Sequence, residues 1–188
     1  MSIKFNFKGF DKALANIDKA NKTQIKGLED ALENFGITTV REAKQRVPVD
    51  EGRLRNSISY QRKKGLFVEV IAQVDYAAYV EFGTRKFAAQ YVSKLPNDWQ
   101  TYAATFKGKG GAGSIEDMIE RLTDWVLRKG LQTGGKRSKK GKADAENVAY
   151  VIALRILQNG IKAQPYMFPA YEIARKQFVE EVKEIFGK

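Results

Sequence analysis

The longest regular pattern of apolar residues lies between about residue 11 and about residue 46. Apolar side chains recur there at steps of three, four, seven or eight, which is the spacing of one buried face of an α-helix. Asp11 is suited to capping its start, and Pro48 ends it because the residue before a proline is driven out of the helical region. We predict one long amphipathic helix whose apolar face carries Leu14, Ile17, Ile25, Leu28, Leu32, Phe35, Val40 and Val47.

Apolar and polar residues alternate in three shorter segments, a period typical of β-strands. The first, residues 3–7, predicts a strand or an extended arm. Residues 54–60 and 66–74 predict two strands of an antiparallel hairpin, in which Gly65 supplies the positive φ of a tight turn. One face of this hairpin is expected to pack on the long helix.

The pattern of residues 76–82 is open to two interpretations. Tyr76, Tyr79 and Val80 have helical spacing, whereas alternation also fits part of the segment. Gly83 ends the element in both cases, as a helix C-cap or as a turn residue.

The second half of the chain carries three more helical patterns, at residues 114–129, at 145–159 and from Pro169 to the end. Ser114 and Asp117 resemble a capping box at the start of the first. The Gly-rich and basic stretches between them bury too little apolar surface to become ordered. We therefore predict a single α+β domain over residues 1–188. In it, the long N-terminal helix and the C-terminal helix pack on a small antiparallel sheet, and residues 86–147 form an insertion with one helix and mobile Gly/Lys-rich loops.

Composition excludes several kinds of chemistry. The 188 residues include no cysteine and no histidine. Disulfides, thiolate metal sites, the usual zinc ligand sets and the Ser-His-Asp and Cys-His arrangements are therefore unavailable. Asp50, Glu51 and Glu81 would suit a metal or acid–base cluster, but nothing in the sequence fixes their mutual distances. We expect no enzymatic activity, no cofactor and no metal, and a hydrolase is only a third interpretation.

The chain also lacks the sequence features of export and membrane insertion. Its first residues lack the apolar core of a signal peptide, and no apolar run approaches the length of a membrane span. The formal charge of +11 favours anionic partners such as nucleic acid or an acidic protein face.

Three segments stand out from this background: DEGRLRNSI from Asp50, YAAYVEFGT from Tyr76, and PYMFPA from Pro165 before the last helix. Together with the hairpin, their order and spacing resemble the head-to-tail joining and tail-completion family of long-tailed bacteriophages, the gene-product-ten type of lambdoid phages. The resemblance covers the long helix, the hairpin and the last helix. The chain departs from the family at Glu51, where a threonine usually follows the aspartate.

This resemblance implies a virion structural protein with an α+β fold and no catalytic activity. It implies assembly in the bacterial host cytoplasm into a homo-oligomeric ring at the head–tail junction, between the head connector and the tail tube or tail terminator. Ring subunits repeat one heterologous contact until it closes, so each subunit must present two unlike surfaces.

The conspicuous polar and aromatic residues of the three segments are the candidates for these surfaces. Asp50, Glu51, Arg53 and Arg55 could pair within their turn or reach a neighbouring subunit, and Glu81 could do the same with Arg85. The aromatic residues favour core or interface packing over base stacking. The full set of predicted interface residues is Asp50, Glu51, Arg53, Arg55, Tyr76, Tyr79, Glu81, Phe82, Thr84, Arg85, Tyr166 and Phe168.

A basic run supplies the candidate for nucleic-acid contact. Residues 128–142 carry seven basic residues and no acidic one, so the run is either a solvated loop or a contact to DNA phosphates without sequence preference. The candidate residues are Lys136, Arg137, Lys139, Lys140 and Lys142. A free-standing, nonspecific DNA-binding protein is accordingly the second interpretation of the whole chain.

Overall fold

A computed structural model of the protein describes residues 22–63, 65–106, 114–131 and 138–187. The predicted arm at residues 3–7 and the predicted start of the long helix lie outside these ranges. The chain divides into two compact units. Unit 1 comprises residues 1–81 and 164–188, and unit 2 comprises residues 82–163, which include the whole of the predicted insertion.

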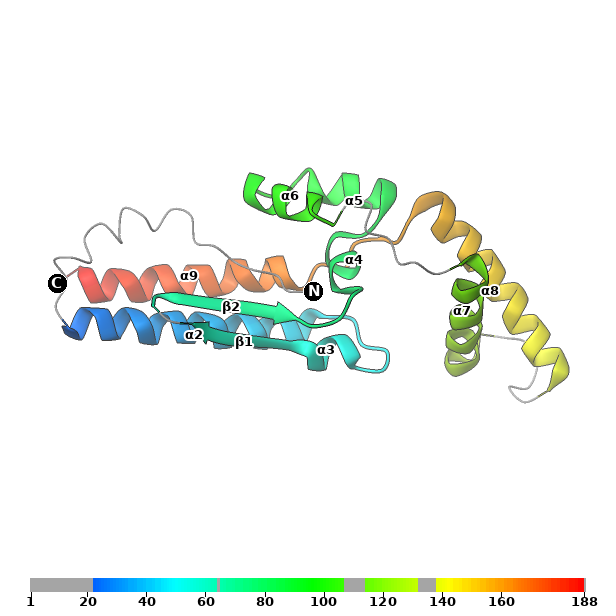
Figure 1. Ribbon diagram of the computed structural model, residues 1–188, viewed down its shortest axis with the longest axis horizontal. Coiled ribbons are helices and arrows are strands. Elements are labelled where there is room, and N and C mark those ends of the chain that lie inside the picture. The colour runs from blue at the N-terminus through cyan, green and yellow to red at the C-terminus, as the bar shows by residue number, and fades with distance from the viewer. Residues whose placement is uncertain (1–21, 64, 107–113, 132–137, 188) are drawn as a thin grey trace. The chain divides into compact units, whose positions relative to one another are not determined.

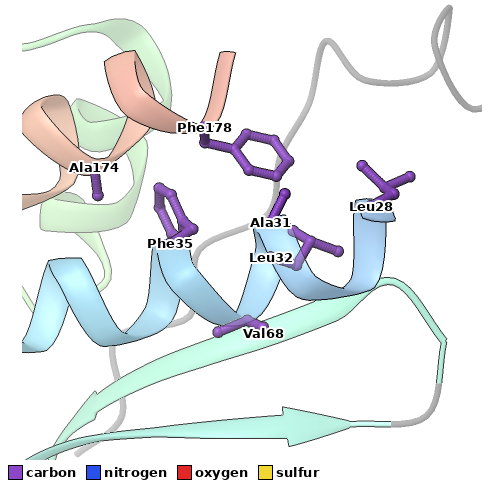
Figure 2. Close-up of a cluster of buried hydrophobic side chains, with 7 residues drawn as sticks. All are labelled: Leu28, Ala31, Leu32, Phe35, Val68, Ala174 and Phe178. Atoms are coloured by element: carbon purple, nitrogen blue, oxygen red, sulfur yellow. The ribbon is translucent and has the colours of Figure 1, made fainter. Parts of the chain in front are cut away.

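Two long helices form the body of unit 1. Helix α2 (Lys22–Arg46) and helix α9 (Met167–Phe186) lie side by side (Figure 1). The Phe35 ring meets those of Tyr171 and Phe178 edge-on, with centroids 5.9 Å and 5.8 Å apart. Figure 2 shows Phe35 and Phe178 in the layer between the helices, where they and their neighbours form a buried apolar core. The predicted long helix is thus confirmed over its described part.

A two-stranded antiparallel sheet covers another side of α2. Strand β1 (Ile58–Lys63) pairs with β2 (Phe67–Ala72), and the register runs from Ile58 opposite Ala72 to Lys63 opposite Phe67. Val68 of β2 belongs to the same core as α2 and α9 (Figure 2), which confirms that the hairpin packs on the long helix. The fold of the described residues is α+β, as predicted.

Polar contacts add to the attachment of the hairpin. Arg62 of β1 forms ion pairs with Glu29 at 2.8 Å and with Glu33 at 3.5 Å, and the Tyr60 hydroxyl donates to Glu33 at 3.3 Å. Glu69 of β2 is buried and pairs with Lys63 across the hairpin. Both faces of β2 are therefore buried rather than one.

The segment before β1 differs from the prediction. Residues 53–57 form the short helix α3 (Arg53–Ser57) instead of running extended. Gly52 has a left-handed φ of 77°, which lets the chain turn directly into the helix, and the Asn56 N–H donates to the Gly52 carbonyl at 2.9 Å. The period of two therefore begins only at Ile58.

Unit 2 holds more helix than predicted. Residues 86–147 were expected to contain one helix, but α5 (Arg85–Val92) and α6 (Asn97–Ala104) precede α7 (Ile115–Lys129), and α8 (Lys139–Asn159) begins within the basic run. The capping box of α7 is confirmed: the Asp117 N–H donates to Ser114 Oγ at 3.1 Å, and the Ser114 N–H donates to Asp117 Oδ2 at 2.9 Å. The loops at 107–113 and 132–137 lie outside the described residues.

Small side chains of α8 pack against larger apolar side chains of α7, among them Val126. The buried residues of α8 follow one another at steps of four, which lets α7 approach closely. Val151 does not belong to this buried face, because its side chain is 57% exposed. The buried residues of α8 are Gly141, Ala145, Ala149 and Ala153.

At Gly36, helix α2 lies close to the hairpin. A Cβ atom there would lie 2.8 Å from Val68 Cγ1 and 2.9 Å from Tyr60 Cδ2. Replacing Gly36 with leucine should therefore lower the free energy of unfolding by about 1–3 kcal/mol or more, as overpacked cores do. Urea denaturation followed by circular dichroism measures this.

Gly27 provides the matched control, because a Cβ atom there meets only the Ile185 side chain, at 3.3 Å. Gly27→Ala should be neutral or stabilising, since alanine favours the helix by about 1 kcal/mol over glycine. A Gly36→Leu protein as stable as the parent would contradict the described packing.

Candidate functional site

Glu81 is the most deeply buried charged residue of the three predicted segments. It lies in helix α4 (Ala77–Phe82), so the ambiguous segment 76–82 is a helix over most of its length. The Glu81 side chain is 0% exposed. Its carboxylate accepts hydrogen bonds from three successive backbone N–H groups, those of Tyr166 at 2.8 Å, Met167 at 2.8 Å and Phe168 at 3.0 Å.

These three N–H groups open helix α9. The first N–H groups of a helix have no partner within the helix, and Tyr166, the N-cap residue, makes no side-chain cap of its own. The next residue, Pro169, has no N–H at all. Glu81 thus caps α9 from 85 residues away, and its position at the positive end of the helix dipole favours a carboxylate.

Further hydrogen bonds hold the same two segments together. In unit 1, the Gln164 N–H donates to the Val80 carbonyl at 2.8 Å, and the Tyr166 hydroxyl lies 3.4 Å from the Ala77 carbonyl. The segments YAAYVEFGT and PYMFPA therefore contact each other.

The chain continues this pairing at the start and end of unit 2. The Thr84 N–H donates to the Ile161 carbonyl at 2.9 Å, and the Ile161 N–H donates to Thr84 Oγ1 at 2.7 Å. Gly83 has a left-handed φ of 73°, and a Cβ atom there would lie 2.8 Å from Ala163 N and Ile161 O. Gly83 therefore ends α4, as predicted, and also admits a close backbone neighbour.

Burial sets the protonation of Glu81. Burial raises the pKa of its carboxyl above the ordinary value, and the N–H groups of Met167, Tyr166 and Phe168 act in the opposite direction without cancelling the rise. The carboxyl therefore holds its proton more tightly in the folded protein than in the unfolded chain.

These contacts correct the predicted role of Glu81. We expected an exposed carboxylate that pairs with Arg85 or reaches another subunit, but the group is buried and its partners are backbone N–H groups of its own chain. Sequence reasoning missed this because the partner lies far along the chain. The available signal was a lone acid in an apolar helix together with a helix start that lacks a capping side chain.

The aromatic candidates divide between core and surface. Tyr166 is buried in unit 1, Tyr79 and Phe168 are half-buried, and Tyr76 is exposed. Phe82 is buried in unit 2, where its ring lies 6.2–6.3 Å from the rings of α6 and the residues after it: Trp99, Tyr102 and Phe106. Phe82 and Tyr166 thus serve as core residues of the chain.

The charged turn before α3 lies on the surface of unit 1. Asp50, Glu51, Arg53 and Arg55 are all exposed. Arg53 Nε and Glu51 Oε2 are 3.1 Å apart, so one of the expected pairs within the turn is present. Exposed pairs contribute only about 0–1 kcal/mol to stability, so this pair adds little to the folding of unit 1.

The remaining candidates belong to unit 2. Thr84 is bonded to Ile161 as described, and Arg85 is exposed with a left-handed φ of 52°. Lys139, Lys140 and Lys142 are exposed in the first turns of α8 rather than in a loop, whereas Lys136 and Arg137 lie outside the described residues.

Two other kinds of site are absent from the described residues. Over those ranges, no three acidic side chains gather closely enough to hold a metal ion. No helix within the same ranges is long and apolar enough to span a bilayer.

Comparison with known proteins gives one match. Residues 11–83 match the family model described as "Bacteriophage HK97-gp10, putative tail-component". No curated protein and no solved structure matches the chain. The match confirms the family resemblance over α2, the hairpin and α4, and it indicates a structural protein associated with a phage tail.

Loss of the Glu81 carboxylate should destabilise unit 1. Glu81→Ala leaves three N–H groups without their acceptor, so we expect a loss of about 3 kcal/mol or more in the free energy of unfolding. Glu81→Gln keeps one acceptor oxygen and should lose less. Chemical denaturation measures both variants.

Glu172 on α9 gives the control, because its carboxylate is partly exposed and pairs with Arg175 at 3.8 Å. Glu172→Ala should change the free energy of unfolding by about 0.5 kcal/mol or less. An equal effect of Glu81→Ala and Glu172→Ala would refute the capping role of Glu81.

The raised pKa of Glu81 predicts a specific pH dependence. Its contribution to stability is complete below the ordinary glutamate pKa of about 4 and is lost as the pH rises through the raised value. The wild-type protein should therefore lose stability relative to Glu81→Gln as the pH is raised. Denaturation of both proteins over a pH series tests this, and a difference that grows in favour of wild type with rising pH would be incompatible with it.

Proposed function

We propose that this protein is a virion structural protein of a tailed phage or prophage that forms a homo-oligomeric ring at the head–tail junction and completes the tail. The observation that carries the proposal is the match of residues 11–83 to a phage tail-component family. Its partners would be the head connector on one side and the tail tube or tail terminator on the other. It would act through protein contacts, without a catalytic step.

The surface of the subunit supports an assembly role. A closed ring of identical subunits needs two unlike surfaces on each subunit. Unit 1 displays the charged turn around Arg53 and Arg55, whereas unit 2 displays an apolar stripe on α8. In that stripe Tyr150, Val151 and Leu154 are 52%, 57% and 39% exposed.

The apolar stripe is the more informative of the two surfaces. Single exposed apolar residues are ordinary, but three neighbours on one helix face form a patch of the kind that protein partners cover. Within α8 the residues that face α7 lie elsewhere, at Ala145 and Ala149, so the stripe is not required by the packing of that pair.

Charged substitutions on these two surfaces should block assembly without unfolding the subunit. In a phage that lacks the natural copy, we expect Val151→Asp and Arg53→Asp each to lower the yield of joined particles by at least about tenfold, because a buried interface charge without a partner costs about 2–5 kcal/mol. Electron microscopy should show tail-less heads beside finished, unattached tails.

Lys176→Asp, at an exposed position of α9 outside both surfaces, is the control and should leave joining unchanged. Thermal denaturation verifies that every variant remains folded. Normal joining by both Val151→Asp and Arg53→Asp, or normal particles in the complete absence of the protein, would overturn the proposed function.

A free-standing, nonspecific DNA-binding protein is the second candidate. The observation that favours it is the exposure of Lys139, Lys140 and Lys142 at the start of α8. The two functions differ in a simple measurement. A ring protein sediments as an oligomer or joins purified tails, whereas a free-standing DNA-binding protein does neither and acts only through DNA contacts whose affinity falls steeply with salt.

A further inference from the structure

Basic side chains of unit 2 gather at one end of the α7–α8 pair. Helix α7 ends with Arg128 and Lys129, and α8 begins with Lys139, Lys140 and Lys142. Val126, Ala145 and Ala149 form one buried cluster, so the last turn of α7 lies beside the first turns of α8 (Figure 1). We call the five basic residues the basic tip.

The basic tip is exposed and has a single sign of charge. All five side chains are exposed, and residues 128–142 include no acidic residue. Arg128 and Lys129 also make contacts within the chain, so the three lysines of α8 are the stronger evidence.

Helix stability does not account for those lysines. The start of a helix is the positive end of its dipole, where each cation costs about 0.3–1 kcal/mol. Helix α7 follows the favourable arrangement, with Glu116 and Asp117 in its first turn and basic residues in its last turn. Helix α8 has no acid in its first turn and three lysines within its first four residues, although Ser138 caps it normally. The three lysines therefore lower the stability of α8, a cost that α7 avoids. Residues kept at such a cost indicate a functional role, here the binding of a ligand.

We propose that the basic tip binds the phosphate backbone of double-stranded DNA without sequence preference. Ammonium groups on two adjacent helix ends can neutralise phosphates on one face of a duplex and release their counterions. Residues 128–142 contain no aromatic side chain, so they offer no stacking surface for the bases of a single strand. This inference does not depend on ring formation.

The test measures binding of the full-length protein to a labelled duplex of random sequence by fluorescence anisotropy over a series of salt concentrations. The variant Lys139→Gln, Lys140→Gln, Lys142→Gln should bind at least about tenfold more weakly at low salt. The slope of log K against log salt should fall by about 3, which is about one for each phosphate that the variant no longer neutralises. The same variant should be as stable as wild type or more stable, because three cations leave the positive end of α8.

The matched control removes three charges elsewhere. Lys94, Lys162 and Lys176 are exposed, and their replacement by glutamine changes the net charge equally. This control should bind the duplex like wild type, and wild type should bind the duplex more tightly than a single strand of equal length.

Each alternative outcome overturns the proposal. An unchanged affinity and salt slope in the α8 variant would show that the basic tip does not bind DNA. An equal loss in the control would show that total charge alone governs binding. Tighter binding to the single strand, or binding to polyglutamate with no binding to duplex, would assign the tip to a different partner. None of these results bears on the particle-joining experiment, so the two proposals can fail separately.

Discussion

The Glu81 carboxylate is the contact on which the arrangement of unit 1 depends. It satisfies the open N–H groups of α9 and thereby fixes where that helix begins relative to α4. Since α9 supplies Ala174 and Phe178 to the core shared with α2 and the hairpin, the position of the cap also determines how that core closes. A buried carboxylate is costly, and three charge-assisted hydrogen bonds offset part of that cost.

The same contact also lies at the point where unit 2 is inserted into unit 1. The chain leaves unit 1 after Glu81 and returns at Gln164, and both residues are bonded at this point within unit 1. The two points at which the chain leaves and re-enters unit 1 are thus held together by these hydrogen bonds, independently of the sequence between them. Because the entropic cost of closing a loop rises only slowly with its length, such a position tolerates a large inserted unit. This fits the family match, which ends at residue 83, one residue after unit 2 begins.

Periodicity predicted the elements that bury large apolar side chains, namely α2, β2, α7 and α9. Periodicity did not predict elements whose conformation is set by a turn residue or that bury no apolar side chain. Residues 53–57 became a helix because of one left-handed glycine, and α5 was missed because it has no buried residue to create a stripe. The helix predicted at 145–159 lies within α8, whose most deeply buried residues are glycine and alanine at steps of four and so add little to an apolar pattern.

The candidate site was predictable in part. The sequence marked the segments around Glu81 and Tyr166 as unusual, and the structure shows that they contact each other. The role of Glu81 was not predictable from local pattern, because a surface ion pair and a distant helix cap leave the same single acid in the sequence. Only the three-dimensional position of the α9 start distinguishes the two.

Amide hydrogen exchange at the start of α9 tests the central contact most directly. If the Glu81 carboxylate holds the N–H groups of Tyr166, Met167 and Phe168 as described, these three amides should exchange as slowly as those of the core residues Ala174 and Phe178. Exchange at the rate of a frayed helix end, while the core amides remain protected, would contradict the account.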